Sequence, residues 1–280
     1  MIISELINCG SKILRQENIE SHILDSELIL SSVLKKSRES IIISSQKEVT
    51  KKDAISFNKL IKRRLKREPL AYILKKKEFW SKSFMIDNNT LIPRPETELL
   101  VEKIIKHYKN KEISILDLGT GSGCIILSLL SEIKKSRGVG IDISKKALNI
   151  AVKNSIQLGL KKKSKFFNKS LNHVYNYKFD LIVSNPPYVC SHQIKNLSDD
   201  VKKHEPRIAL DGGNDGLDVI KKVIYKSRNV LKIKGLLALE IGHGQFRKVS
   251  QILNSQGFRV KFLIKDYQNN IRCIITTLEH

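Results

Sequence analysis

Apolar residues recur at helical spacing along residues 1–75, where strand-like alternation is weak. The stripes expected to face a common core are Leu6, Ile7, Ile13 and Leu14, then Leu24, Leu28, Ile29 and Val33, then Leu60, Ile61 and Leu65. The third stripe lies in a basic helix that should end before Pro69, because a proline disfavours helical geometry in the residue before it. The pattern predicts a small N-terminal helical bundle.

The pattern changes after residue 75. Residues 78–80 and 83–86 have strand-like composition, and the Asp-Asn-Asn sequence at 87–89 is a turn signal. We expect residues 76–95 to form a β-hairpin linker. The proline-rich segment Leu91–Glu98 then leads into a helix with acidic residues in its first turn.

From residue 111 onward, short apolar runs alternate with helical segments. The predicted strands are 113–118, 138–142, 179–184 and 236–241, and the predicted helices are 125–133, 145–158 and 217–231. This alternation predicts a mostly parallel α/β sheet within a domain of residues 96–280. Two further strands, 258–264 and 271–277, lack an intervening helix, so we expect the last strand to be antiparallel.

Length and cysteine spacing narrow the class of protein. The 280 residues are 41% hydrophobic, which is enough for a sizeable core, and no run approaches the ~20 apolar residues that span a bilayer. Residues 1–5 lack the basic start and apolar core of a signal peptide. The four scattered cysteines contain no C-x-x-C pair, so we expect neither a zinc site nor disulfides, and a cytoplasmic location.

The net charge of +23 has two interpretations. Only 12 of the 51 basic residues are arginine, and lysine, isoleucine and asparagine are all abundant, as an AT-rich genome would produce. The dense basic runs at 62–67 and 75–77 could instead attract RNA or an acidic partner.

A glycine-rich loop, Asp117–Gly123, follows the first predicted strand of the sheet and opens a helix. Gly119 and Gly121 would take positive φ and let a ligand approach the backbone, and Gly123 would let the helix pack closely on the sheet. Asp142 ends the next strand, where a carboxylate can accept both hydroxyls of a ribose. A nicotinamide enzyme shares these features, but its fingerprint places the third glycine one residue later.

The quartet Asn185-Pro186-Pro187-Tyr188 follows the predicted strand 179–184. Its two prolines remove two backbone donors and fix two φ angles, and the residue before each proline is pushed toward extended geometry. The resulting stiff loop presents the Asn185 side chain and neighbouring carbonyls as an array of acceptors that suits a planar NH2 group. For an isolated Asn-Pro pair, an Asx-turn is the alternative.

Four separated motifs resemble the release factor glutamine N5-methyltransferase family of class I methyltransferases. They are Leu91–Glu98, Asp117–Gly123, Asn185–Tyr188 and Glu205–Leu217, in an order and spacing that agree across residues 70–277. The quartet alone is shared with adenine-N6 methyltransferases, whereas the segment Leu91–Glu98 is specific to this family. Two segments depart from the family pattern, Ser170-Leu171 and Asn270–Arg272, and we expect neither to touch the transfer site.

The resemblance implies a seven-stranded Rossmann-like sheet and transfer of a methyl group from S-adenosylmethionine. The acceptor would be the amide nitrogen of the glutamine in the Gly-Gly-Gln motif of class 1 peptide chain release factors, with residues 1–75 recognising the substrate. The implied cofactor-binding residues are Asp117, Gly119, Thr120, Gly121, Ser122, Gly123, Asp142, Leu171 and Asn185. The implied catalytic and substrate-binding residues are Asn185, Pro186, Pro187 and Tyr188, and no metal is implied.

In this interpretation the Asn185 side-chain oxygen and the Pro186 carbonyl each accept one N–H of the substrate amide. Tyr188 would pack against the amide and orient it with its hydroxyl. Arg94, Thr97 and Glu98 would line the mouth of the site, and helix capping by Thr97 is the alternative. His204 and Glu205 could form an acid–base pair, but a structural loop is the favoured interpretation, and His243 is read as a turn residue.

Two other function classes stay open. A methyltransferase acting on adenine or another nucleobase amine would share the quartet, but such an enzyme needs a target-recognition region, and no sizeable one lies beyond the helical bundle. A non-catalytic protein that binds ribosomal RNA would not need the glycine loop, Asp142 and Asn185 together. We therefore expect a monomeric enzyme that needs neither direct nucleic-acid binding nor a membrane.

Overall fold

The computed structural model describes residues 1–171 and 177–279 and divides the chain into two compact units. The first unit comprises Met1–Lys75 together with Ser198–His204, and the second comprises Lys76–Leu197 and Glu205–His280. No helix within the described residues is both long enough and apolar enough to cross a membrane.

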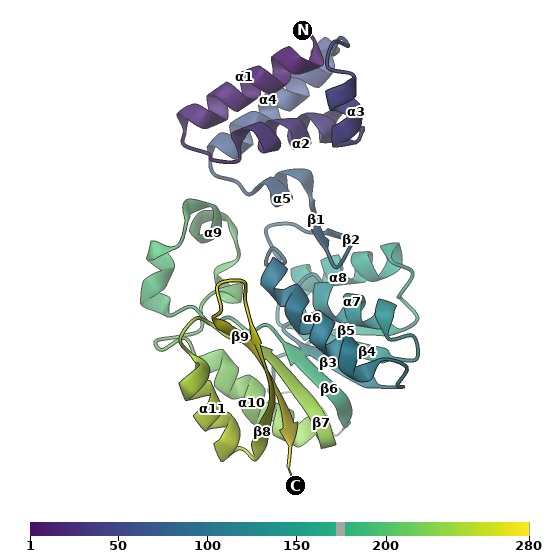
Figure 1. Cartoon of the computed structure of the whole chain (residues 1–280), viewed down its shortest axis with the longest axis vertical. Helices are drawn as coiled ribbons and strands as arrows, with labels where there is room; N and C mark the ends of the chain where they lie inside the picture. The colour runs from purple at the N-terminus through teal and green to yellow at the C-terminus, as the bar shows by residue number, and fades with distance from the viewer. Residues whose placement is uncertain (172–176, 280) are drawn as a thin grey trace. The chain divides into compact units, whose positions relative to one another are not determined.

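The first unit is helical, as the spacing of its apolar residues predicts. Its helices are α1 (Ile3–Gln16), α2 (His22–Leu34), α3 (Arg38–Ile43), α4 (Lys51–Leu65), α5 (Leu70–Leu74) and α9 (Asp199–His204). The basic helix α4 ends before Pro69, as expected. Fully buried side chains such as Leu14, Ile29 and Phe57 form the core of this unit. Figure 1 draws helices α1 to α4 in purple and blue.

Two residues predicted for this core are exposed instead. Ile13 is 38% exposed and Leu24 is 42% exposed. On α2 the buried position next to Leu24 belongs to Asp25, whose Oδ2 accepts a hydrogen bond from Arg64 Nε at 2.6 Å. Arg64 Nη1 also donates to Asp200 Oδ2 on α9 at 2.7 Å. The spacing of apolar residues cannot predict that Asp25 is buried in place of Leu24. A charged residue is rarely buried unless it is paired, and the partner here is distant in the sequence.

The second unit contains a seven-stranded sheet in the order β5-β4-β3-β6-β7-β9-β8. Its strands are β3 (Ser114–Leu118), β4 (Arg137–Asp142), β5 (Ser164–Asn168), β6 (Phe179–Ser184), β7 (Leu231–Glu240), β8 (Phe258–Lys265) and β9 (Ile271–Leu278). The last strand, β9, is antiparallel to both β7 and β8, which confirms the predicted fold class. The short edge strand β5 was missed because most of its side chains are exposed and it has no continuous apolar run.

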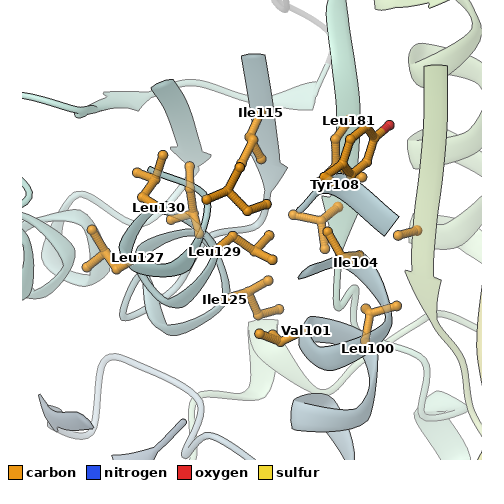
Figure 2. Packing of buried hydrophobic residues seen from close by; sticks show 14 of the residues in the cluster. Leu100, Val101, Ile104, Tyr108, Ile115, Ile125, Leu127, Leu129, Leu130 and Leu181 are labelled. Atoms are coloured by element: carbon orange, nitrogen blue, oxygen red, sulfur yellow. The ribbon is translucent and has the colours of Figure 1, made fainter. Parts of the chain in front are cut away.

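Helices cover both faces of this sheet (Figure 1). On one face α6 (Pro95–Tyr108) and α7 (Cys124–Glu132) pack on Ile115 and Leu181, and Figure 2 shows this cluster. On the other face α10 (Asp218–Val230) and α11 (Phe246–Ser255) pack on Leu116 and Ile182. Consecutive residues of β3 therefore serve opposite faces, as strand geometry requires. Helix α8 (Lys145–Gln157) packs on β4 and β5.

The hairpin before the sheet is formed by β1 (Lys76–Phe79) and β2 (Lys82–Met85). Its turn is made by Trp80 and Ser81, whose φ values of 52° and 51° match the left-handed pair typical of tight hairpins. The turn predicted at residues 87–89 is present after β2, where the Thr90 N–H donates to the Asp87 carbonyl at 3.0 Å. The sequence placed Trp80 in a strand instead of in the hairpin turn, and that assignment was wrong. Neither turn residue is one of the glycine or asparagine types that usually mark such a turn.

Asp25→Ala should destabilise the first unit, because it leaves the buried Arg64 guanidinium without its shortest ion-pair contact. Loss of one partner of a buried pair costs about 3 kcal/mol or more. Leu24→Ala, one residue away and exposed, should change stability by less than about 0.5 kcal/mol. Urea unfolding of the full chain measures both, and equal effects would contradict the buried-pair account.

Candidate active site

A cavity of about 540 Å³ opens beyond the carboxyl ends of β3, β4 and β6 in the second unit. Several residues predicted for the cofactor and acceptor sites line it, namely Gly119, Thr120, Gly121, Ser122, Asp142, Leu171, Asn185, Pro186 and Pro187. Asp117, Gly123 and Tyr188 are not among its lining residues. Asp117 and Gly123 are hydrogen-bonded to Thr120 of the lining, and Tyr188 follows Pro187 in the chain. The topology thus brings together motifs separated by up to about 70 residues of sequence at one edge of the sheet, where ligands bind in this fold class.

The glycine loop has the backbone geometry that its sequence predicts. Gly119, Gly121 and Gly123 have φ values of 75°, 54° and 80°. A Cβ added at Gly119 or Gly121 would meet no atom within 4 Å, so glycine is needed there for conformation and leaves open space above the backbone. At Gly123 a Cβ would lie 3.2 Å from Ala151 Cβ, so the close packing is against α8 rather than against the sheet.

Asp142 is held rigidly at the end of β4. Its Oδ2 accepts the Gly121 N–H at 2.9 Å, and its Oδ1 accepts the Ser144 N–H at 2.8 Å. Burial raises the pKa of Asp142, although these backbone hydrogen bonds oppose the shift. A carboxylate fixed beside the glycine loop has lone pairs left over for the hydroxyls of a ribose.

Asp117 lies beneath the loop with one oxygen unsatisfied. It is 1% exposed, and its Oδ2 accepts the Thr120 hydroxyl at 2.7 Å. Its Oδ1 makes no hydrogen bond of normal geometry among the residues that the structure describes, although the Ile126 N–H is near enough to lower the Asp117 pKa. Burial raises the Asp117 pKa to about 7, against the Thr120 hydrogen bond and with help from the Asp142 charge. Unpaired buried carboxylate oxygens are rare, so this atom is available to accept a hydrogen bond from a bound ligand.

Asn185 follows β6 and contacts a buried polar network. Its Nδ2 donates to Thr97 Oγ1 at 3.4 Å, and that hydroxyl donates to Glu240 Oε2 at 2.6 Å. Thr97 lies in the first turn of α6, and Glu240 ends β7. Both are buried, and burial raises the Glu240 pKa against the Thr97 hydrogen bond and the Arg272 charge.

Tyr188 joins the same network through the other carboxylate oxygen of Glu240. Its hydroxyl accepts from Arg272 Nη2 at 3.0 Å and donates to Glu240 Oε1 at 3.4 Å. Burial and the Glu240 charge raise the Tyr188 pKa to about 12, so the hydroxyl keeps its proton. The expectation that the segment Asn270–Arg272 stays away from the quartet was wrong, because Arg272 contacts Tyr188 directly.

Glycines elsewhere in the chain let the quartet backbone be clamped. A Cβ on Gly212 would lie 2.9 Å from the Pro187 carbonyl oxygen and 2.9 Å from Tyr188 Cα. Gln245 Nε2 donates to the Tyr188 carbonyl at 3.0 Å and to the Gly216 carbonyl at 3.2 Å. Gly212 and Gly216 are therefore required by the close approach of the quartet backbone.

The residues expected around the site mouth separate into two groups. Arg94 and Thr97 line the cavity, whereas Glu98 accepts the Trp80 N–H at 3.1 Å. Buried Glu205 accepts hydrogen bonds from the Ile92 N–H at 3.2 Å and from Arg94 Nη2 at 2.5 Å. It therefore holds the proline-rich segment in place. This arrangement agrees with the structural-loop interpretation of Glu205.

Two histidines singled out in the sequence lie outside this cavity lining. His204 Nε2 lies 3.0 Å from the Lys66 carbonyl in the first unit, and His243 lies in an exposed turn, as predicted.

Sequence reasoning missed the roles of Glu240 and Arg272. A weak signal for Glu240 exists, since a single carboxylate closes an apolar run at the carboxyl end of a strand. Arg272 carried no such signal, because its contact with Tyr188 spans 84 residues and depends on how β9 inserts beside β7.

Comparison with known proteins identifies matches over both units. The family described as the PrmC N-terminal domain matches residues 5–74, and the Methyltransferase small domain matches residues 95–204. A release factor glutamine methyltransferase of Clostridium acetobutylicum is 36% identical over 279 residues, which is 98% of this chain and 98% of that protein. Another, from Buchnera aphidicola subsp. Schizaphis graminum, is 42% identical over 89% of this chain and 90% of its own length.

A solved structure supports the class of fold. The hMettl16 catalytic domain, crystallised in complex with the MAT2A 3'UTR hairpin 6, superposes with a TM-score of 0.58. The match covers 75% of this chain and 80% of that one at 18% sequence identity. At that identity the likeness concerns the fold alone.

Asp117→Asn should change how stability depends on pH in the protein without cofactor. The folded state holds the Asp117 proton up to a pH of about 7, whereas an unfolded chain releases it near about pH 4. Over that interval the folded state binds more protons, so this group lowers stability as the pH rises. The variant lacks this loss and should be more stable than the wild type at pH 8.

Asp180→Asn provides the matched control. Although burial opposes ionisation, hydrogen bonds from Lys232 and Ser114 lower the Asp180 pKa, so its carboxylate stabilises the fold above about pH 4. This variant should therefore lose stability at neutral pH. Thermal denaturation between pH 4.5 and 8 measures both, and a pH-independent difference between Asp117→Asn and wild type would contradict the assignment.

Proposed function

The chain belongs to the release factor glutamine methyltransferase family, and from that premise we propose that it methylates the side-chain amide nitrogen of a release factor glutamine. The acceptor is the glutamine of the Gly-Gly-Gln motif in class 1 peptide chain release factors, and the methyl donor is S-adenosylmethionine. The observation that carries this proposal is the juxtaposition of the glycine loop and the quartet around one cavity.

The residues around the cavity fit S-adenosylmethionine. Asp117 Oδ1 is a buried acceptor without a hydrogen bond of normal geometry among the described residues, which suits the ammonium of the cofactor's amino-acid end. Asp142 stands where a ribose would be held, and Gly119 to Ser122 and Leu171 supply the remaining wall. When bound, the cofactor supplies a methyl group on a sulfonium, which is already activated for transfer.

The quartet orients the nucleophile in this proposal. An amide nitrogen is a poor nucleophile because its lone pair is delocalised into the carbonyl. Asn185 Oδ1 and the Pro186 carbonyl each accept one N–H, which holds the nitrogen in place and favours the positive charge that develops there. Pro187 stiffens the loop, and Tyr188, bound to Glu240 and Arg272, fixes its far end. As the N–CH3 bond forms, the S–CH3 bond breaks to leave a neutral thioether, and the positively charged amide nitrogen then releases one N–H proton to water, so no strong general base is needed.

The two units have separate roles in this proposal. Residues 1–75 recognise the substrate protein, residues 76–95 link the units, and residues 96–280 carry the chemistry. The enzyme acts as a monomer, needs no direct contact with nucleic acid, and works in the cytoplasm, which four free cysteines favour. The adenine-N6 alternative is not favoured, because the relatives that align over nearly the full chain are glutamine methyltransferases.

Asn185→Ala should lower turnover on a release factor by roughly 10²-fold or more, because it removes one oriented acceptor at the nucleophile. Asn254→Ala, an exposed asparagine on α11, should leave turnover unchanged. Radiolabelled methyl transfer from S-adenosylmethionine to purified release factor measures both rates. Normal turnover of a folded Asn185→Ala variant would refute the role of this residue.

The same assay tests the substrate class. Purified wild-type enzyme should label a release factor and leave DNA and RNA unlabelled. A glutamine-to-alanine change in the Gly-Gly-Gln motif should abolish labelling of the release factor. Labelling of nucleic acid alone would overturn the proposed function in favour of a nucleobase methyltransferase.

A further inference from the structure

We propose that Thr97 and Glu240 are positioning residues that fix which end of the Asn185 amide faces the substrate. The inference rests on the proposed function and adds a cause for the orientation of its key side chain. Asn185 carries an oxygen and an NH2 group of nearly equal size, and only the oxygen can accept a substrate N–H. Something other than shape must therefore select the orientation.

The Thr97 hydroxyl makes that selection through its single proton. A hydroxyl donates one hydrogen bond and otherwise accepts. The Thr97 proton is committed to Glu240 Oε2 at 2.6 Å, the short distance of a bond to a carboxylate. Toward Asn185 the hydroxyl can then only accept, so it faces the NH2 group at 3.4 Å. The Asn185 oxygen is left for the cavity, which Asn185 lines.

The second carboxylate oxygen of Glu240 also accepts a hydrogen bond from a hydroxyl. Arg272 Nη2 donates to the Tyr188 hydroxyl at 3.0 Å, and that hydroxyl donates to Glu240 Oε1 at 3.4 Å. Glu240 thus accepts from two hydroxyls, one on each oxygen, and donates to neither. Burial raises the Glu240 pKa, and the Thr97 hydrogen bond and the nearby Arg272 cation oppose that shift by favouring the accepting carboxylate. The hydrogen bonds from Arg272 to Tyr188 and from Asn185 to Thr97 thus both lead, through a hydroxyl, to this one carboxylate.

Because these groups are buried, the direction of each hydrogen bond cannot easily change. Glu240 is 0% exposed and Thr97 is 2% exposed, so water cannot readily replace a lost partner. If the amide of Asn185 turned over, its oxygen would face a hydroxyl without a free proton. Its NH2 group would face the NH2 group of the substrate, and two donors form no hydrogen bond. The reversed rotamer is therefore both unsupported and unreactive.

Thr97→Val removes the hydroxyl at nearly constant volume and is the primary test. It should lower kcat on a release factor by roughly 10- to 100-fold, the scale of a mispositioned catalytic group, with a much smaller change in KM for S-adenosylmethionine. Thr97→Ser restores a hydroxyl and should recover most of the rate. Glu240→Gln offers a second variant, because its amide can donate to Thr97 and release the Thr97 proton toward Asn185.

Thr276→Val is the matched control. Thr276 is also fully buried and lies on β9, and its hydroxyl donates to the Leu237 carbonyl at 3.3 Å. The same chemical change there should leave kcat close to that of the wild type. Thermal unfolding of each variant separates lost folding from lost turnover.

A double-mutant comparison decides whether Thr97 acts through Asn185. In an Asn185→Ala background, Thr97→Val should cause no further loss of kcat, because the side chain that it orients is gone. If the wild type methylates the release factor, either of two results would overturn this inference. One is a double variant whose loss of kcat equals the product of the two single losses, and the other is a Thr97→Ser variant as slow as Thr97→Val. A wild type that fails to methylate the release factor would overturn the proposed function and this inference together.

Discussion

The site depends on how three buried or half-buried carboxylates at the carboxyl edge of the sheet are paired. Asp117 lies near the end of β3, Asp142 ends β4 and Glu240 ends β7. A carboxylate removed from water must find donors, and each of these finds a different set. Asp142 takes backbone N–H groups, Glu240 takes two hydroxyls, and Asp117 keeps one oxygen unpaired within the described residues. The first two pairings hold the chain, and in the proposed function the third leaves an acceptor for the cofactor.

A buried hydrogen bond also connects the quartet with the glycine loop. Ser184, beside Asn185, donates its hydroxyl to the Leu118 carbonyl at 2.7 Å, which ties the start of the quartet to the start of the glycine loop. Gln245 and the glycines at 212 and 216 hold the far end of the quartet. The stiffness that two prolines give to the loop is therefore anchored at both ends. Such anchoring is what a rate gain from orientation requires.

The sequence predicted those parts of the site whose residue types have a local reason. Gly119 and Gly121 need positive φ, Asp142 ends a strand, and the quartet carries two consecutive prolines, so each could be found in a short window. Glu240 and Arg272 could not be assigned in this way, because their contacts with residues 97 and 188 join distant segments. The buried Asp25 and the turn at Trp80 escaped for the same physical reason, since tertiary partners override local preference. The fold class, by contrast, follows from repeated alternation that no single error can disturb.

The central claim is that the quartet holds the glutamine of a release factor and not a nucleobase. Its chemistry, an array of acceptors for an NH2 group, serves either acceptor, and the family of the chain is what favours the protein. The most direct measurement is mass spectrometry of the Gly-Gly-Gln peptide of the release factor, taken from cells with and without this gene. The account predicts a glutamine heavier by one methyl group in the first and unmodified glutamine in the second. The same methylation in both would contradict it.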